Sequence, residues 1–132
     1  MNATMQLIED ELARRKLAAE QEQIERESQK QACRAMFKPI WDMWLDVQDV
    51  VVYDKYRYEN RSLKDMALVG SETMLRLRVS GEMHGWELES VWSDDDGPIL
   101  RFNGGHPIDL TWAKHLFIQK IADLMENKAV KP

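Results

Sequence analysis

The densest cluster of potential metal ligands in the chain is the run Asp94-Asp95-Asp96-Gly97. An EF-hand calcium loop spaces its oxygen ligands along the loop and ends in a distant bidentate glutamate. Here the aspartates are contiguous, and the twelfth position counted from Asp94 is Gly105. We therefore interpret the run as the solvated tip of a hairpin and expect no metal site.

The other residues that could perform chemistry do not form a recognisable catalytic or metal-binding motif. None of His84, His106 and His115 has a Cys or His partner at the spacing of zinc ligands. Serines in predicted turns lack the G-x-S-x-G motif of a nucleophile elbow. The Gly104-Gly105 pair lacks the lysine and the spaced glycines of a phosphate-binding loop. We expect no catalytic residues and no cofactor, and a small enzyme of unknown reaction is only our third hypothesis.

Aromatic and basic side chains alternate in residues 53–61, namely Tyr53, Lys55, Tyr56, Arg57, Tyr58 and Arg61. The bases of single-stranded nucleic acid can stack on tyrosines while Lys and Arg hold the phosphates. Arg76 and Arg78 could extend this patch if their strand lies beside it. The competing interpretation is a half-exposed strand whose tyrosines pack on hydrophobic neighbours. Nucleic-acid binding through this stretch is therefore the alternative function.

The N-terminal segment, residues 2–34, is predicted to be one long helix. It has no Gly or Pro and many strong helix formers, and Thr4 could act as its N-cap. Opposite charges recur at helical spacing, as in Glu11 with Arg15 and Glu22 with Arg26. About 33 residues of helix reach roughly 50 Å, so we expect residues 1–34 to project as an arm from a single domain of residues 35–132.

The arm carries a thin apolar stripe that follows a heptad repeat: Met5, Ile8, Leu12 and Ala19. Arg15, Glu22 and Arg26 occupy further positions of the same seam, where a coiled coil needs apolar residues. Leu17 and Ile24 lie on a different line. We expect the stripe to contact a second copy or another protein, and the alternative is a helix that is only solvated. Self-association is slightly favoured, and a dimer made by this arm alone should be weak.

A β-hairpin is predicted around residues 73–90, because apolar and charged residues alternate there with period two. Pairing Val79 with Trp86 brings Leu77 opposite Leu88, Arg78 opposite Glu87 and Arg76 opposite Glu89. A shift by one residue would bury the arginines.

Five further elements complete the predicted domain. Helical spacing of apolar residues predicts a Trp-rich helix over residues 39–49. We also expect a strand over 50–58, where a continuation of the preceding helix is the alternative. A short helix over 62–69 capped by Ser62 and a strand over 99–102 follow. A last helix follows the cap Asp109, with the apolar face Ala113, Leu116, Phe117, Ile121 and Leu124. The fold class is α+β, with a mostly antiparallel sheet of three or four strands packed by the Trp-rich and C-terminal helices.

The order of helix, strands and helix in residues 39–127 is similar to that of double-stranded-RNA-binding domains. That family's helix begins with a cluster of lysines. The corresponding start here reads Thr111-Trp112-Ala113-Lys114-His115. The resemblance is one of element order, and no residue of that family is carried over to this chain.

Composition limits the function further. The net charge is −5 over 132 residues, and no segment is strongly basic, which disfavours generic nucleic-acid binding. No apolar run approaches the roughly 18 residues of a membrane span, residues 1–11 do not resemble a secretory signal, and the single Cys33 suggests a cytoplasmic protein.

We expect a small non-catalytic regulator, inhibitor or adaptor that binds another protein. Its size would also fit an accessory protein of a bacteriophage or mobile element.

Overall fold

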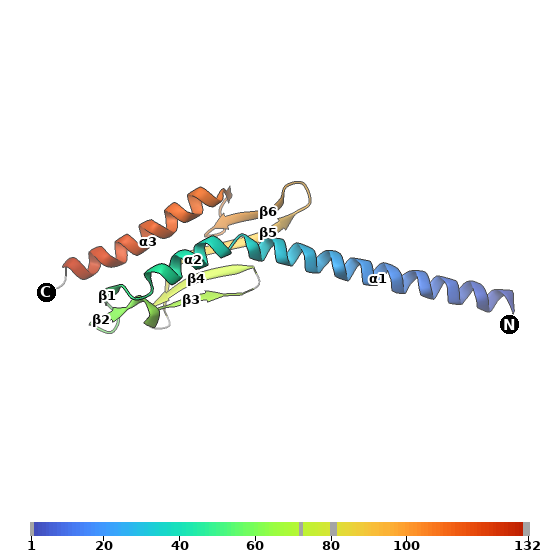
Figure 1. Cartoon of the computed structure of the whole chain (residues 1–132), viewed down its shortest axis with the longest axis horizontal. Helices are drawn as coiled ribbons and strands as arrows, with labels where there is room; N and C mark the ends of the chain where they lie inside the picture. The colour runs from blue at the N-terminus through green and yellow to red at the C-terminus, as the bar shows by residue number, and fades with distance from the viewer. Residues whose placement is uncertain (1, 72, 80–81, 131–132) are drawn as a thin grey trace.

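The protein has an α+β fold in which one long helix extends away from a body of strands and two further helices (Figure 1). The computed structural model describes residues 2–71, 73–79 and 82–130. The helices are α1 (Ala3–Ala35), α2 (Lys38–Val47) and α3 (Leu110–Val130). Their positions confirm the long N-terminal, Trp-rich and C-terminal helices predicted from the sequence.

Helix α1 begins two residues earlier than Thr4 would place it. The side chain of Asn2 accepts a hydrogen bond of 2.7 Å from the backbone N–H of Met5, so Asn2 is the N-cap and the assignment to Thr4 is wrong. Asparagine is among the strongest N-caps, and it satisfies one of the first-turn N–H groups that lack a helical partner. At the other end, only Met36 and Phe37 separate α1 from α2, which has Pro39 in its first turn.

The strands form two antiparallel sheets, with more strands than the three or four expected. A two-stranded sheet pairs β1 (Val51–Asp54) with β2 (Glu59–Ser62). A five-stranded meander follows in chain order, made of β3 (Ala67–Gly70), β4 (Met74–Val79), β5 (Glu82–Ser93), β6 (Gly97–Phe102) and β7 (Pro107–Ile108).

Two local predictions change at these strands. The helix expected over residues 62–69 is only a single 3-10 turn, Leu63–Asp65, capped by Ser62 as predicted. The remainder becomes β3, because Leu68 and Val69 pair with β4 and this pairing outweighs the weak local helix signal. The strand expected over 50–58 ends at Asp54, and residues 55–58 form the turn to β2.

The predicted hairpin is present, but its register is displaced by two residues at Leu75 and Arg76 and by four at Arg78 and Val79, so the predicted pair of Val79 with Trp86 is wrong. Leu75 lies opposite Leu88 and Arg76 opposite Glu87, so the predicted pairs of Leu77 with Leu88 and Arg78 with Glu87 are wrong. Strand β5 begins at Glu82, earlier than the alternation suggested, and an irregularity lies between Arg76 and Arg78. A shift of two preserves the faces, because side chains alternate with period two.

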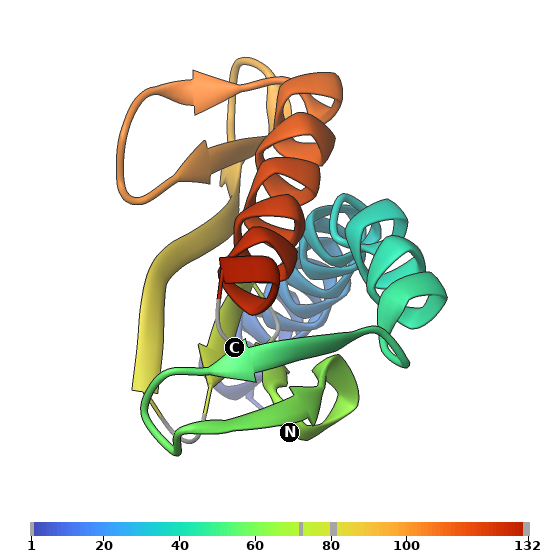
Figure 2. The same ribbon diagram turned by 90° about the vertical axis from the view of Figure 1, so that its left-hand side faces the viewer.

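One apolar core lies between the five-stranded sheet and the helices α2 and α3. Figure 2 shows these two helices on the same side of the strands, with the β1–β2 hairpin near the C-terminal end of α3. Trp86 contacts Phe102 and Phe117 edge to face at 5.8 and 5.9 Å between ring centroids. Asp109 caps α3 through a bond of 2.7 Å from the N–H of Trp112, as predicted. The buried face of α3 is Ala113, Phe117, Ile121 and Leu124.

Candidate protein-binding arm and basic-aromatic tip

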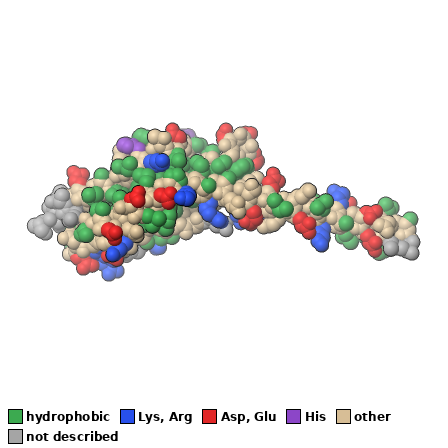
Figure 3. Space-filling model, viewed as in Figure 1, with side chains coloured by type: hydrophobic (Ala, Val, Ile, Leu, Met, Phe, Trp, Pro, Cys, Tyr) green, Lys and Arg blue, Asp and Glu red, His purple; other side chains and the backbone are tan. Residues whose placement is uncertain are grey.

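The free part of α1, residues 3–25, is exposed around its whole circumference apart from the half-buried Glu11. From here on we call this segment the arm, because residues of the predicted 1–34 arm from Arg26 onward adjoin the body. The side chains of Met5, Ile8 and Leu12 are 44%, 47% and 58% exposed, and Ala19 is exposed on the same seam. Figure 3 shows apolar side chains along the arm, interspersed with both signs of charge. The arm therefore presents the predicted stripe to solvent and to any partner chain.

Charged residues that interrupt the seam are held by ion pairs within their own helix. Glu11 accepts hydrogen bonds from Arg14 and from Arg15, whose Nε lies 3.0 Å away. These two arginines, Arg14 first, lower the pKa of the Glu11 carboxyl, and Glu11 in turn raises the pKa of Arg14. Arg26 donates to Glu22 in the same manner. The seam charges are thus ordered along the helix surface before any partner arrives.

The heptad line of the stripe continues into the body. Cys33, which is 3% exposed, stands two heptads after Ala19. Met36 follows it at the spacing that separates Ile8 from Met5, and packs against the core. Here Arg26, Cys33 and neighbouring residues of α1 line a shallow groove of about 270 Å³ with Thr73 and Trp92. One face of α1 is therefore a packing surface at its C-terminal end and uncovered along the arm.

The turn between β1 and β2 is organised by a buried carboxylate. Asp54 is 1% exposed, and its Oδ1 accepts from the backbone N–H groups of Tyr56 and Arg57 at 2.9 and 3.2 Å. Its Oδ2 lies 3.1 Å from Nη1 of Arg61, which also donates to the carbonyl of Asp65. Arg61, one of the predicted nucleic-acid residues, thus compensates a buried charge and has a structural role.

Four other predicted residues lie together at this exposed tip. Tyr58 is 81% exposed and has a φ of +57°, in the left-handed region that bulky residues rarely adopt. Tyr56 is exposed, and the ammonium of Lys55 lies 5.3 Å from its ring centroid. Tyr53 is half-buried in β1. We call Lys55, Tyr56, Arg57 and Tyr58 the tip.

Two arginines expected to extend the patch belong elsewhere. Arg76 and Arg78 lie on β4 in the five-stranded sheet, whereas the tip belongs to the separate β1–β2 sheet. Arg76 also pairs with Glu87, with 3.3 Å between Nε and Oε2.

A cation from α3 was missed by sequence reasoning. Burial lowers the pKa of the Lys120 ammonium, nearby Lys55 lowers it further, and Asp123 acts in the opposite direction. Lys120 and Lys55 are far apart in sequence, and α3 packs against β1 in the fold. No local pattern in the chain could have indicated this proximity.

The residues considered for metal binding or catalysis do not converge in the described part of the chain. No group of three His, Cys, Asp or Glu side chains there could hold a metal ion. The aspartates of residues 94–96 are exposed at the β5–β6 turn, and the N–H of Asp96 donates to Ser93. His106 and His115 are exposed, and Cys33 is buried. The side chain of His84 lies outside the described residues.

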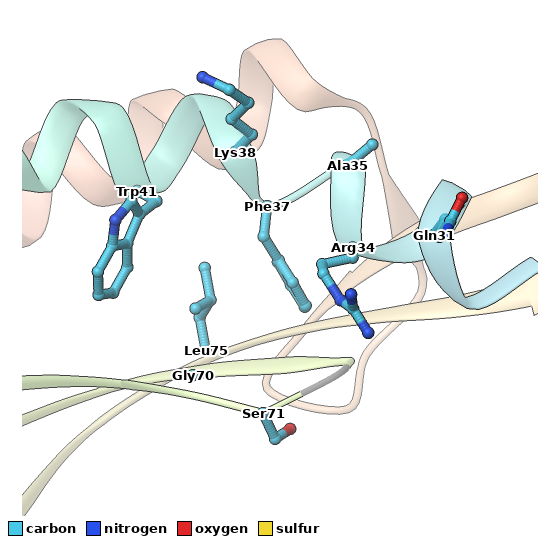
Figure 4. Close-up of a pocket in the computed structure, with 9 residues that line it drawn as sticks. All are labelled: Gln31, Arg34, Ala35, Phe37, Lys38, Trp41, Gly70, Ser71 and Leu75. Carbon is cyan, nitrogen blue, oxygen red and sulfur yellow. The ribbon is translucent and has the colours of Figure 1, made fainter. Parts of the chain in front are cut away.

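A groove of about 570 Å³ lies where the α1–α2 junction crosses β3 and β4. In Figure 4 the side chains of Phe37, Trp41 and Leu75 point into the space between helix and strands, while Lys38 points away from the strands. Lys38 is paired with Asp42 at 3.0 Å. Trp41 of α2 is 40% exposed along this groove.

No family model, curated protein or solved structure matches this chain. Among the described residues, no helix is both long enough and apolar enough to span a membrane.

Proposed function

We propose that this protein is a small non-catalytic regulator, inhibitor or adaptor that acts by binding another polypeptide through its arm. The binding surface is the stripe Met5, Ile8, Leu12 and Ala19, and a second copy of the chain is the favoured partner. The observation that carries this proposal is the apolar line on α1, which is uncovered along the arm and packed at the body.

Physical chemistry supports a binding role for such a helix. Isolated helices are marginally stable in water, and most helical stability in proteins comes from packing an amphipathic face. A helix that extends over several unsupported turns and still keeps a heptad line is suited to packing against another chain. Because Arg15 and Glu22 interrupt that line, the contact is expected to be weak and concentration-dependent.

The test compares two double variants of the full chain by sedimentation or light scattering over a concentration series. Ile8→Glu with Leu12→Glu places charge on the stripe and should abolish self-association. Leu17→Glu with Ile24→Glu is the matched control, because these exposed residues lie on another line of the same helix. The control should associate as the unsubstituted chain does.

Two results of this experiment would contradict the proposed role of the arm. If the unsubstituted chain is monomeric at every concentration and recovers the same proteins from a source-cell extract as the stripe variant, the arm is only a solvated helix. Equal loss of association in both variants would contradict the assignment of the stripe.

Binding of single-stranded nucleic acid at the tip is the second candidate function. Its specific support is the exposed, left-handed Tyr58 beside Lys55 and Arg57, because strained residues cluster at functional sites. Tyr56 provides a second ring, and Lys120 adds a nearby positive charge. Arg61 is engaged by Asp54 and contributes to the shape of the turn.

Fluorescence anisotropy with a labelled single-stranded oligonucleotide tests the second candidate. Binding should weaken steeply with salt, since counterion release drives it. Tyr56→Ala or Tyr58→Ala should each cost roughly 1–3 kcal/mol of stacking. Lys114→Ala, an exposed cation on α3 at the other end of the helix, should leave affinity nearly unchanged. No binding at low salt would remove this candidate.

A further inference from the structure

We propose that two copies of the chain pair antiparallel along their arms, with Leu12 of one copy opposite Arg15 of the other. This inference rests on the proposed self-association and adds its geometry. In the same register Ile8 packs on Ala19 of the second copy and Met5 on Glu22, and each contact occurs twice about a two-fold axis near residues 13 and 14.

The length of the arm fits this register. Asn2 of one copy lies beside Glu25 of the other, and α1 first contacts its own body around Arg26 and Gln29. The overlap therefore uses the whole free arm and ends where the partner's body begins. The two bodies stand at opposite ends of the paired helices, so they do not compete for space.

Charges on the seam exclude the parallel alternative. A parallel pair aligns each heptad position with itself, so Arg15 would face Arg15, Glu22 would face Glu22 and Arg26 would face Arg26. Like charges at a helix interface cost stability. The antiparallel register places Arg15 against Leu12 and Glu22 against Met5, so no two charges of one sign meet across the seam.

The seam charges are also prepared for this arrangement. Arg15 is held by Glu11 of its own helix, so its guanidinium remains at the edge while its methylene stem lies over the leucine of the second copy. Glu22 is likewise held by Arg26. Both side chains can cover apolar neighbours without losing their ionic partners.

Residues that flank the seam favour the same pairing. In an antiparallel pair, a heptad position beside the seam meets the same heptad position of the second copy. Glu9 and Lys16 share one such position, so Glu9 of each copy lies near Lys16 of the other. The parallel arrangement would instead pair Glu11 with Lys16, and Glu11 is already engaged by Arg14 and Arg15. Opposite charges therefore meet twice across the antiparallel interface.

Distances between spin labels on the full chain test the arrangement. Nitroxides are attached at Ala13→Cys or at Ser28→Cys, two exposed positions off the seam, with the buried Cys33 replaced by alanine. The antiparallel register predicts a short distance between the two copies at residue 13. At residue 28 it predicts a separation of roughly 45 Å along the helix axis, at 1.5 Å rise per residue.

The possible outcomes separate this inference from the proposed function. Short distances at both positions mean parallel pairing, which overturns the antiparallel inference and leaves self-association standing. Absence of dipolar coupling at both positions, with the labelled chains folded by circular dichroism, overturns both.

Disulfide formation keeps the proposal testable if Cys33→Ala does not fold. Ile8→Cys and Ala19→Cys chains of distinguishable mass, each retaining Cys33, are mixed under mild oxidation. The antiparallel register predicts a disulfide between the Ile8→Cys chain and the Ala19→Cys chain, and none between two chains of the same kind. Disulfides formed only between like chains would overturn it.

Discussion

Asp54 is the residue on which the β1–β2 turn depends. Its carboxylate is buried, holds two backbone N–H groups of the turn and is neutralised by Arg61. A buried charge that loses its partner is strongly destabilising, whereas exposed charges contribute little. The tip keeps its shape because this one side chain is satisfied on all sides.

Arg61→Ala should therefore lower the free energy of unfolding by about 3–5 kcal/mol, because it leaves the Asp54 carboxylate buried without its ion pair. Arg57→Ala, an exposed cation in the same turn, should change it by less than about 1 kcal/mol. Urea denaturation followed by tryptophan fluorescence measures both. Similar losses for the two variants would contradict the role assigned to Arg61.

Ser90 presents the opposite situation in the core. It is fully buried on β5, and its Oγ has no hydrogen-bond partner among the described residues. A buried hydroxyl without a partner costs about 1–3 kcal/mol. Ser90→Ala should therefore leave the melting temperature unchanged or raise it. Leu88→Ala, on the same face of the same strand, should lower stability by about 2–5 kcal/mol. A clear loss in Ser90→Ala would contradict this view.

Single residues with a local mechanism could be predicted from the sequence. Ser62 and Asp109 were identified as caps, since a cap depends only on residues within one turn. Arg61 was assigned to ligand binding because the burial of Asp54, which determines its role, arises only when β1 packs against α3. The N-cap was assigned to Thr4 and is Asn2, because both are good caps and the local pattern did not distinguish them.

At the scale of elements, the hairpin shows what alternation can and cannot determine. The pattern of Leu75 to Leu88 assigned the buried and exposed faces correctly, because period two is a local property. The register depends on where the turn closes, and β5 begins at Glu82. The observed register keeps one Arg–Glu pair, Arg76 with Glu87, and places Arg78 opposite Met83. An even displacement leaves the buried and exposed faces unchanged, so alternation alone does not distinguish the registers.

The observed register predicts which charges interact. A double-mutant cycle on Arg76 and Glu87 should give a favourable coupling of about 0.2–1 kcal/mol, as expected for a partly exposed cross-strand pair. The same cycle on Arg76 and Glu89, the pair expected from the sequence, should give a coupling near zero. Stability is measured by thermal or urea unfolding of the four chains in each cycle. Coupling in the second cycle alone would contradict the register.

Long helices were the elements most fully predicted. α1 and α3 carry their helical signal over many turns, so small errors at the ends do not change their identity. The helix predicted over residues 62–69 was wrong where β3 forms. The four residues of β3 carry little local signal, and their conformation depends on pairing with β4. The groove beside Trp41 could not be predicted, since it arises where distant elements meet.

At the scale of the whole molecule, backbone protection should be graded along α1. The arm has no tertiary support, and an isolated helix opens readily from a free end. Hydrogen exchange followed by mass spectrometry should find fast exchange near the N-terminus, slowing toward Arg26. Raising the protein concentration should slow exchange in the arm and leave α3 unchanged if copies pair. Uniform protection along α1 in dilute solution would contradict this expectation.

The junction between α1 and α2 has a mechanical consequence. Only two residues separate the helices, the N–H of Phe37 donates to the carbonyl of Arg34 at 3.0 Å, and the Phe37 ring is buried in the core. This short connection restricts the angle between the two helices. Helix α1 therefore moves as a rod fixed to the body and not as a flexible linker. At a length of roughly 50 Å, a tilt of about 5° at Phe37 moves the far end by about 4 Å. A load at the N-terminal end of α1 is therefore transmitted as torque to α2 and to the strands beneath it.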